Sequence, residues 1–401
     1  MSTVQEDSIK IYINTIKENH NKEVYIYGAG NMAKSLYLLC KDNEIIVKGF
    51  LVTDIKVNVN ELFGLPVRQF DTVKLEPDEA LILIGVIENG VKIIADMLKA
   101  KGWKNYISLT QELCTHISYM NEDRIRPMME ITTVIGCSIN CRYCPQSVLL
   151  KTYYAQNNKR NRVMELEDYK KCIDKLPQNV RIRFAGFSEA FLNPQCTHMI
   201  EYAAGKGREI DLYTTLVGLT KEGFKRIKSI PFRRVVLHTA DVDGYANIPV
   251  TDEYLNLLQE VVFACKVDGS PFIDWANCQS TPHPRVLDII GGRVRISAEL
   301  YDRAGNVEDN SDLKQVDYVS GTIECVLSEK MDRTVLLPDG TVVLCCNDYG
   351  LEHPLGNLLS ENYESILDGE EMRRIRIACQ DESLPLLCRK CVWAKQMGHF
   401  E

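Results

Sequence analysis

The chain has 401 residues, which at about 150 residues per domain predicts two to three domains. Hydrophobic residues make up 45% and charged residues 25%, as is usual for a soluble globular protein. The net charge of −8 argues against a protein that grips nucleic acid over its whole surface. No apolar run approaches the roughly 18–20 residues that span a bilayer, and the polar first 22 residues lack a signal-peptide pattern. We therefore expect a cytoplasmic protein that binds neither membrane nor nucleic acid.

The sequence contains 15 cysteines, and their spacing is its most informative feature. This density is too low for a small protein held together by disulfides, and a reducing cytosol disfavours disulfides in any case. Some of the thiols should therefore ligate metal or act in catalysis.

Residues 1–118 alternate between β-rich and helical patterns. Strands are expected at 23–27, 45–51 and 80–84. Helices are expected at 8–22, from the glycine loop through Leu39, and at 91–101. Such alternation predicts a parallel, doubly wound sheet in an N-terminal domain.

A glycine loop, Gly28-Ala-Gly30-Asn-Met-Ala, follows the first strand and opens a helix. Backbone N–H groups in that setting can face a phosphate, and Asp54 lies near the usual place of a ribose-binding acid. With its runs Lys-Gly-Phe-Leu at 48–51 and Gly-Leu-Pro-Val at 64–67, the segment resembles Rossmann-like modules of bacterial surface-polysaccharide enzymes. The resemblance implies either a nucleotide or nucleotide-sugar bound at Gly28 and Gly30, or a structural or docking role.

Residues 119–315 carry six strand patterns with helical patterns between several of them. The strands are expected at 129–134, 180–184, 209–215, 234–238, 271–275 and 293–300, and the helices include 165–176 and 252–265. Six βα repeats predict a partial (β/α)6 barrel, whose loops at the carboxyl ends of the strands carry the chemistry.

Residues 316–401 predict a small C-terminal domain rich in cysteine. Turn signals at Pro338-Asp-Gly340 and Gly356-Asn357 favour a hairpin, and a helix is expected at 363–378.

The first cysteine group follows the first barrel strand, with the spacing Cys137-x3-Cys141-x2-Cys144. Three thiolates from one short loop can hold three irons of a cubane cluster and leave the fourth iron open. A zinc site with a distant fourth ligand, or a chance grouping of three thiols, is the alternative. With Tyr143 in the aromatic position, the loop resembles the motif of the radical S-adenosylmethionine (SAM) superfamily.

That resemblance implies a [4Fe–4S] cluster on Cys137, Cys141 and Cys144, with SAM chelating the open iron and Tyr143 beside the cofactor. It also implies a flavodoxin- or ferredoxin-type electron donor, cleavage of SAM to a 5′-deoxyadenosyl radical, and hydrogen abstraction from an unactivated C–H bond. The cofactor carries this chemistry, while the protein orients and shields it.

The second barrel strand ends in a run that looks like the family's glycine–glycine–glutamate–proline element, which binds the SAM amino group. Gly186 permits close backbone approach, and Glu189 can accept hydrogen bonds from an ammonium group. Ser188 is a further candidate, although Phe187-Ser188 and Ala190 depart from the family pattern. Thr214, Thr215 and His238 end later strands, where they can meet SAM or substrate or serve as ordinary barrel residues.

The second cysteine group comprises Cys325, Cys345, Cys388 and Cys391, and it can complete a cluster with no open position. Its spacing resembles the C-terminal extension called SPASM, or the shorter twitch form. Because residues 392–401 contain no cysteine, one auxiliary [4Fe–4S] cluster is expected rather than two. Cys346 is an alternative to Cys345, Cys379 is an alternative ligand that a helical setting disfavours, and a structural zinc site is the alternative centre.

We interpret the whole as a radical SAM oxidoreductase that acts on a small sugar, polyol or nucleotide-linked sugar in surface-polysaccharide biosynthesis. The favoured reaction is alcohol oxidation, with Arg303 after the sixth strand as a substrate contact and the auxiliary cluster as electron acceptor. The alternative is epimerisation, which needs a thiol to return a hydrogen atom. Cys278 is the favoured thiol, with Cys196 and Cys265 also spare.

Two further interpretations remain. A peptide-modifying maturase is common among enzymes with this extension, although the N-terminal domain does not look like a peptide-recognition module. A non-catalytic redox sensor is disfavoured by the run around Gly186 and Glu189, because a sensor needs no SAM pocket.

Overall fold

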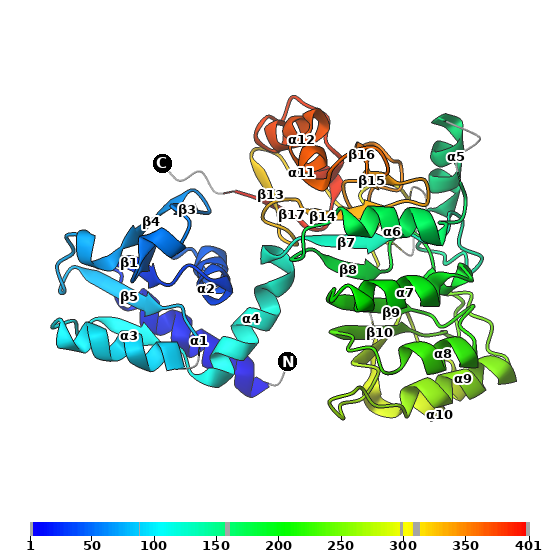
Figure 1. The fold of residues 1–401 in the computed structure, drawn as a ribbon, viewed down its shortest axis with the longest axis horizontal. Coiled ribbons are helices and arrows are strands. Elements are labelled where there is room, and N and C mark those ends of the chain that lie inside the picture. The colour runs from blue at the N-terminus through cyan, green and yellow to red at the C-terminus, as the bar shows by residue number, and fades with distance from the viewer. Residues whose placement is uncertain (1–2, 88, 157–160, 297–299, 308–312, 398–401) are drawn as a thin grey trace. The chain divides into compact units, whose positions relative to one another are not determined.

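The computed structural model describes residues 3–87, 89–156, 161–296, 300–307 and 313–397 (Figure 1). The chain divides into two compact units, Met1–Ile125 and Arg126–Glu401. None of the helices in the described ranges combines the length and the apolar character needed to cross a membrane.

The first unit is built around a six-stranded sheet of order β3-β4-β2-β1-β5-β6, in which only the β3–β4 pair is antiparallel. Its strands are β1 Glu23–Tyr27, β2 Val47–Val52, β3 Glu61–Leu62, β4 Leu65–Gln69, β5 Ala80–Ile84 and β6 Tyr106–Ser108. Its helices are α1 Thr3–Lys17, α2 Asn31–Asp42, α3 Asn89–Ala100 and α4 Gln111–Ile125, with short 3-10 turns η1 Ile55–Val57 and η2 Phe70–Thr72.

Side chains of β1 alternate between two cores on opposite faces of this sheet. Ile26 packs with residues of α1, α2 and α4, whereas Tyr27 packs with residues of α3. All five residues of β5 are buried, as expected for a central strand covered on both faces. The predicted doubly wound arrangement of the N-terminal domain is confirmed.

The second unit contains a nine-stranded sheet of order β12-β11-β10-β9-β8-β7-β14-β15-β16. Its strands are β7 Met128–Ile131, β8 Arg181–Phe184, β9 Ile210–Thr214, β10 Arg234–His238, β11 Trp275–Cys278, β12 Val294–Ile296, β14 Arg333–Leu336, β15 Thr341–Val343 and β16 Pro354–Asn357. The strands from β7 to β12 are all parallel, which confirms the predicted partial barrel.

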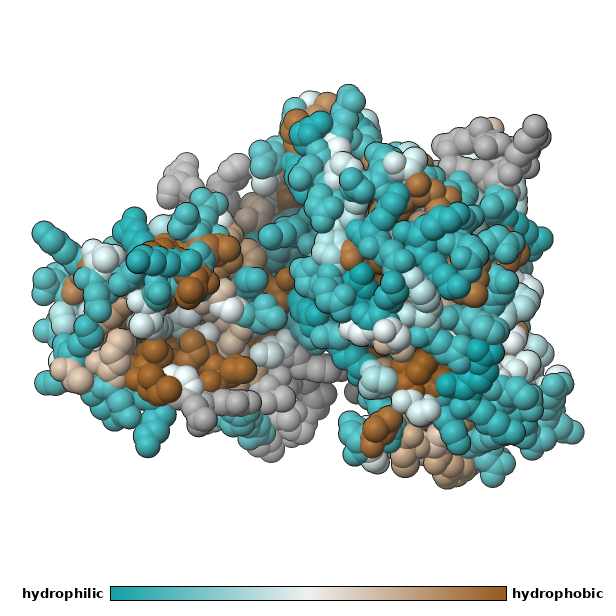
Figure 2. Space-filling view, in the orientation of Figure 1, coloured by the Kyte–Doolittle hydropathy of each residue, from teal (hydrophilic) through white to brown (hydrophobic). Residues whose placement is uncertain are grey.

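Helices connect the barrel strands and cover their outer face (Figure 1). They are α5 Gln146–Gln156, α6 Leu166–Asp174, α7 Cys196–Gly205, α8 Lys221–Ile227, α9 Asp252–Val262 and α10 Pro284–Ile290, with short turns η3 Ala190–Leu192 and η4 Gly291–Arg293. The visible surface over α6 and α7 is mainly hydrophilic (Figure 2), since these helices direct their apolar residues to the barrel.

The concave face of the barrel carries charge. β7, β8 and β9 each direct a buried charged residue to this face: Glu130, Arg183 and Asp211. The residues on either side of each point the other way and pack beneath the helices. Arg183 bonds the Asp211 carboxylate at 3.0 Å, approaches Glu130 at 3.4 Å and lies 4.6 Å from the centre of the Tyr213 ring. This charged layer forms a polar floor rather than an apolar core.

The C-terminal segment extends the barrel sheet. β14 pairs in parallel with β7, and β15 returns antiparallel after the predicted turn, where Gly340 has a φ of +83°. The remaining elements are β13 Ile323–Cys325, β17 Ala394–Gln396, α11 Tyr363–Leu367, α12 Glu370–Gln380 and the 3-10 turn η5 Leu387–Lys390. β13 and β17 form a separate antiparallel pair.

Several predicted boundaries are wrong. The fifth strand, expected at 271–275, begins only at Trp275, because Phe272 bonds back to Ala264 and the Asp274 carboxylate binds the backbone N–H of Val235. The helix expected at 363–378 is two helices, since the chain turns at Gly369.

Other boundaries differ by a few residues. The helix expected at 8–22 is α1 Thr3–Lys17, and the last strand, expected at 293–300, is β12 Val294–Ile296, with 297–299 outside the described residues. The boundary between the two compact units falls after Ile125, whereas a domain boundary at 118 was expected. The second unit is not divided at 315, where another boundary was expected. The three-domain division therefore stays a prediction.

The Asp211 carboxylate yields a stability prediction, because it also binds Arg233 at 2.7 Å. Burial alone raises its pKa, but Arg233 and Arg183 outweigh burial and hold the pKa below its usual value. Its contribution to stability is therefore present at neutral pH and is lost as the pH falls through that lowered pKa. We expect Asp211→Asn to lower the free energy of unfolding by about 3–5 kcal/mol, because two guanidinium groups lose a buried partner.

Urea unfolding followed by circular dichroism measures this effect. Glu222→Gln is the matched control, because that side chain is 81% exposed and its ion pair is long, at 4.0 Å. Equal unfolding midpoints for the two variants would contradict the assignment of Asp211.

Candidate active site

The three cysteines of the first group lie in the loop between β7 and α5. Cys137, Cys141 and Cys144 all line one cavity of about 360 Å³ at the carboxyl ends of the barrel strands. Gly136 and Asn140 have positive φ values, of +87° and +47°, which let the loop turn tightly. The structure therefore brings the three predicted ligands to one site.

Gln146 fixes this loop. Its side-chain oxygen accepts the Cys137 N–H at 3.0 Å, and its amide nitrogen donates to the Cys144 sulfur at 3.2 Å and to the Phe187 carbonyl at 2.7 Å. The amide thus joins both ends of the cysteine loop to the loop after β8.

The thiols themselves fit an iron–sulfur group. Burial raises the pKa of Cys141 to about 12, and burial is also the main cause of the raised pKa of Cys137. Buried thiols such as these two ionise readily only when a cation binds them. This chemistry suits iron, with one position left for a ligand from outside the chain.

The loop after β8 approaches β7 very closely. Gly186 has a φ of +78°, and a Cβ there would lie 2.4 Å from the Thr132 hydroxyl oxygen. The same hydroxyl accepts the Phe187 N–H at 3.1 Å. Ser188 lines the cavity, and its hydroxyl is buried without a hydrogen-bond partner among the described residues. A ligand in the cavity would supply that partner.

Glu189 is buried and accepts bonds from the end of β9. Its carboxylate oxygens accept the Thr214 hydroxyl at 2.8 Å, the Thr215 hydroxyl at 2.7 Å and the Thr215 N–H at 2.5 Å. Burial raises its pKa, and the hydrogen bond from the Thr215 backbone is the largest opposing effect. Glu189 therefore holds two strand ends together at the cavity wall, and the SAM contact expected of it stays a proposal.

Arg303, Tyr143 and His238 meet at the same cavity. The Arg303 guanidinium lies 5.9 Å from the centre of the Tyr143 ring, on a backbone with a φ of +53°. Burial lowers the pKa of Arg303, but Tyr349, Cys144 and Cys346 together outweigh burial and raise it. Burial and the nearby Arg303 lower the pKa of His238 to about 4, so its imidazole is neutral at pH 7.

Cys278 does not reach this cavity. It is the last residue of β11 rather than a residue beyond the strand, and it is fully buried with its thiol 3.8 Å from the Ala240 carbonyl. Asn277 pairs with His238 across the strands, so Cys278 points to the opposite face, toward the helices. Cys196 is buried as well, and Cys265 is exposed.

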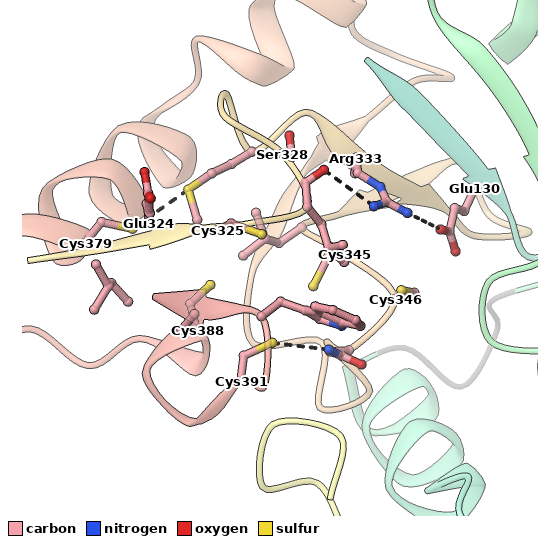
Figure 3. A pocket seen from close by; sticks show the side chains of 17 residues that line it. Glu130, Glu324, Cys325, Ser328, Arg333, Cys345, Cys346, Cys379, Cys388 and Cys391 are labelled. Atoms are coloured by element: carbon pink, nitrogen blue, oxygen red, sulfur yellow. Dashed lines mark hydrogen bonds and ion pairs between the residues drawn. The ribbon is translucent and has the colours of Figure 1, made fainter. Parts of the chain in front are cut away.

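The second cysteine group lines its own cavity, of about 60 Å³. Figure 3 shows the sulfur atoms of Cys325, Cys345, Cys388 and Cys391 directed toward a common space. Burial raises the pKa of Cys345 well above its usual range, and the neighbouring thiols raise it further. The four predicted ligands are therefore brought together, and iron would again supply the cation that they need.

The alternative ligands lie differently. Cys379 turns its thiol to the Met331 sulfur, 3.8 Å away, on the far side of this cavity (Figure 3). Cys346 stands apart from the four thiols and lines both cavities. Within the described ranges, no three His, Cys, Asp or Glu side chains lie close enough together to share a single metal ion. A [4Fe–4S] cluster instead takes each thiolate on a separate iron.

Sequence reasoning missed several residues at these sites. Gln146 lies two residues after Cys144 and could have been found as a polar residue at the start of a helix. Tyr349 and Trp393 reach the first cavity from the C-terminal segment. No local pattern marks them, because only the β7–β14 pairing brings them there.

The predicted nucleotide site lies in the first unit. Gly28 has a φ of +128°, and a Cβ there would lie 2.6 Å from the Gly85 carbonyl oxygen, so close packing alone requires this glycine. Gly30 precedes α2 and faces open space. The Asp54 carboxylate binds the Lys56 N–H at 2.9 Å within its own turn. Nucleotide binding here stays a prediction.

Among known proteins, a family match is found for the C-terminal segment. Residues 325–392 match the SPASM family, described as an iron–sulfur cluster-binding domain. No curated protein matches the sequence. Three similar solved structures are BtrN in complex with AdoMet and 2-DOIA, SuiB of Streptococcus suis bound to S-adenosylmethionine, and anSMEcpe with bound AdoMet.

The similarity to these structures is distant. The TM-score is 0.42 for BtrN, 0.39 for SuiB and 0.37 for anSMEcpe, at 15%, 12% and 16% sequence identity. The matches cover 64%, 72% and 66% of this chain and 88%, 80% and 86% of the respective structures.

The fold and the cysteine groups point to the same kind of protein. A parallel partial barrel carries the C-x3-C-x2-C loop after its first strand, and the segment that follows the barrel matches the SPASM iron–sulfur domain. The C-terminal segment is therefore similar to SPASM iron–sulfur domains, and the cysteine loop on the barrel resembles the motif of the radical SAM superfamily.

The two cysteine groups predict the iron content. After anaerobic reconstitution we expect about eight irons per chain, because the sequence predicts one four-iron cluster on each group. Replacing Cys137, Cys141 and Cys144 together by alanine should remove about half, and so should replacing Cys325, Cys345, Cys388 and Cys391. Iron and sulfide analysis measures both.

Single alanine variants of Cys346 and Cys379 are the matched controls, and both should keep the full iron content. About four irons per chain in the unaltered protein would contradict the assignment of two clusters. Loss of iron from Cys346→Ala would transfer the ligand role from Cys345 to its neighbour.

Proposed function

We propose that this protein is a radical SAM enzyme that oxidises an alcohol carbon of a sugar, polyol or nucleotide-linked sugar. The observation that carries the proposal is the first cavity, which the three-cysteine loop lines together with Cys346 and Trp393 of the C-terminal segment. A substrate in it would lie between the two iron–sulfur sites. When bound, SAM and the clusters supply hydrogen-atom abstraction and one-electron transfer.

The side chains of the cavity suit a small, polar substrate. Arg303 has no carboxylate within ion-pair distance among the described residues, and its guanidinium can hold a substrate oxygen that becomes negative. His238 is neutral at pH 7, since its pKa is lowered to about 4, and its unprotonated ring nitrogen can accept a hydrogen bond from a substrate hydroxyl. Alcohol oxidation removes a hydrogen atom, a proton and an electron. Arg303 would stabilise the oxygen as its proton leaves to solvent, and His238 would orient the hydroxyl.

A sugar is favoured because charged and polar side chains line part of the cavity, and because the sequence of the first unit resembles modules of polysaccharide enzymes. Glu130 and Arg183 line the cavity from β7 and β8, and Tyr213 lines it from β9. Such groups can form hydrogen bonds with several hydroxyl groups of a substrate, which a purely apolar pocket cannot do.

Epimerisation is the second candidate, and one observation now favours a particular thiol for it. Cys346 lines the cavity, whereas Cys278 faces the helices. Burial, together with the nearby Glu130, raises the pKa of Cys346 to about 12, so it keeps the hydrogen that epimerisation would need.

The first expected outcome concerns the reaction. Reduced, reconstituted protein should convert SAM to 5′-deoxyadenosine, and deuterium from the oxidised carbon of a sugar substrate should appear in that product. Arg303→Met should lower substrate-dependent turnover roughly ten- to hundredfold, because a charge-assisted hydrogen bond of about 1.5–3 kcal/mol is lost. Mass spectrometry of 5′-deoxyadenosine measures both.

Arg285→Met is the control for loss of an arginine, since Arg285 is 52% exposed and lies outside the first cavity. A fully reconstituted sample that releases no 5′-deoxyadenosine would refute the enzyme assignment. Deuterium transfer from a short peptide rather than from any sugar would favour the maturase interpretation.

The second expected outcome separates oxidation from epimerisation. An oxidising enzyme yields a carbonyl product and leaves no solvent deuterium on the sugar, and Cys346→Ala then keeps this outcome. An epimerase incorporates solvent deuterium at carbon, and Cys346→Ala abolishes that incorporation while Cys278→Ala does not. Deuterium incorporation that only Cys278→Ala abolishes would show that the structural choice of thiol is wrong.

A further inference from the structure

One loop of the C-terminal segment contacts both cysteine groups. Residues 344–353 connect β15 to β16, and the loop closes where the Leu344 N–H donates to the His353 carbonyl at 3.2 Å. The Asp348 carboxylate, fully buried at the centre of the loop, accepts the N–H groups of Glu352 at 2.7 Å and of His353 at 3.0 Å. These bonds hold the loop in a single shape.

Tyr349 projects from this loop to the first cysteine group. Its hydroxyl oxygen lies 3.2 Å from the Cys144 sulfur, and the side chain is 4% exposed. Its ring centre lies 4.6 Å from that of Phe187, in the loop after β8. A thiolate that ligates iron carries no proton, so the tyrosine O–H must be the donor in the loaded protein.

Asn347 projects from the same loop to the second cysteine group. Its amide nitrogen donates to the Cys391 sulfur at 3.3 Å, and the residue is 5% exposed (Figure 3). The Asn306 side chain in turn donates to the Asn347 carbonyl at 3.0 Å and fixes its position. Two residues of one rigid loop therefore direct hydrogen bonds to ligands of two different centres.

Hydrogen bonds to ligand sulfur have a defined electrochemical consequence. Reduction adds negative charge to a cluster, and a donor aimed at the sulfur stabilises that charge. The bond therefore raises the reduction potential, and its effect is strongest in a buried site. Removal of the donor should make the cluster harder to reduce.

We propose that the 344–353 loop tunes both iron–sulfur centres, with Tyr349 as the positioning residue for the three-cysteine centre and Asn347 for the four-cysteine centre. This inference rests on the assignment of the two clusters within the proposed function. It assigns the C-terminal domain a second role, because that domain supplies a hydrogen bond to a ligand of the barrel cluster.

Redox titrations of the reconstituted full chain, followed by electron paramagnetic resonance, test the proposal. Tyr349→Phe removes one oxygen and should shift the midpoint potential of the three-cysteine centre to a more negative value, with the other centre unchanged. Asn347→Leu, of similar shape, should shift only the four-cysteine centre in the same direction. Unchanged potentials in both variants, or equal shifts of both centres in each, would overturn the proposal.

Tyr363→Phe is the matched control, because Tyr363 is also buried and its hydroxyl has no hydrogen-bond partner among the described residues. This variant should move neither potential, and a shift equal to that of Tyr349→Phe would show that any buried tyrosine has this effect. Should Tyr349→Phe lose its iron, Tyr349→Met is the second variant, because it also removes the hydroxyl donor while filling part of the same space. It should shift the potential of the three-cysteine centre in the same negative direction, and an unchanged potential would overturn the proposal.

These measurements need neither SAM nor a substrate. A protein that loads and reduces both clusters but shows no selective shifts would refute the tuning role alone. A protein that loads no cluster on either cysteine group would refute the proposed function as well.

Discussion

The parallel ladder between β7 and β14 is the constraint on which both candidate sites depend. β7 carries the three-cysteine loop at its end, and β14 begins the hairpin that leads to Cys345, Cys346 and Tyr349. Residues Arg333 to Leu336 pair with Met128 to Ile131, and the Thr132 N–H continues the ladder to the Leu336 carbonyl at 3.0 Å. Because β15 runs back antiparallel to β14, Cys345 and Cys346 follow it near the start of β14, and Glu130, Arg333 and Cys346 line both cavities.

The charged layer beneath the cavity follows from the same sheet. Burial of Glu130, Arg183 and Asp211 costs solvation energy, which close pairing offsets only when each group has partners. Arg333 of β14 approaches Glu130 at 3.8 Å, so the added strand contributes to this layer. The pairing fixes polar side chains beneath the first cavity in a rigid array, which would help to orient the proposed sugar substrate.

How well the sequence predicts each part depends on how local its cause is. β1, β5 and β10 lie where the sequence places them, because each is a short apolar run bounded by turn or polar residues. The cysteine groups were found because ligand spacing is itself a local pattern. The sequence did not show that Cys278 points to the helix-covered face of the barrel. The fifth strand starts at Trp275, four residues later than its apolar run suggests, and therefore includes Cys278. Tyr349 and Gln146 act through contacts that only the folded chain creates, and Tyr349 depends on the non-local β7–β14 pairing.

The central claim is that the three-cysteine loop holds a cluster with one iron open to SAM. Electron–nuclear double resonance tests this claim most directly, on the reduced, reconstituted chain with SAM labelled by ¹⁵N in its amino group or ¹⁷O in its carboxylate. The account predicts that both labels couple to the cluster, and that the coupling disappears when Cys137, Cys141 and Cys144 are replaced by alanine. A fully loaded protein in which neither label couples and SAM leaves the spectrum unchanged would contradict the account.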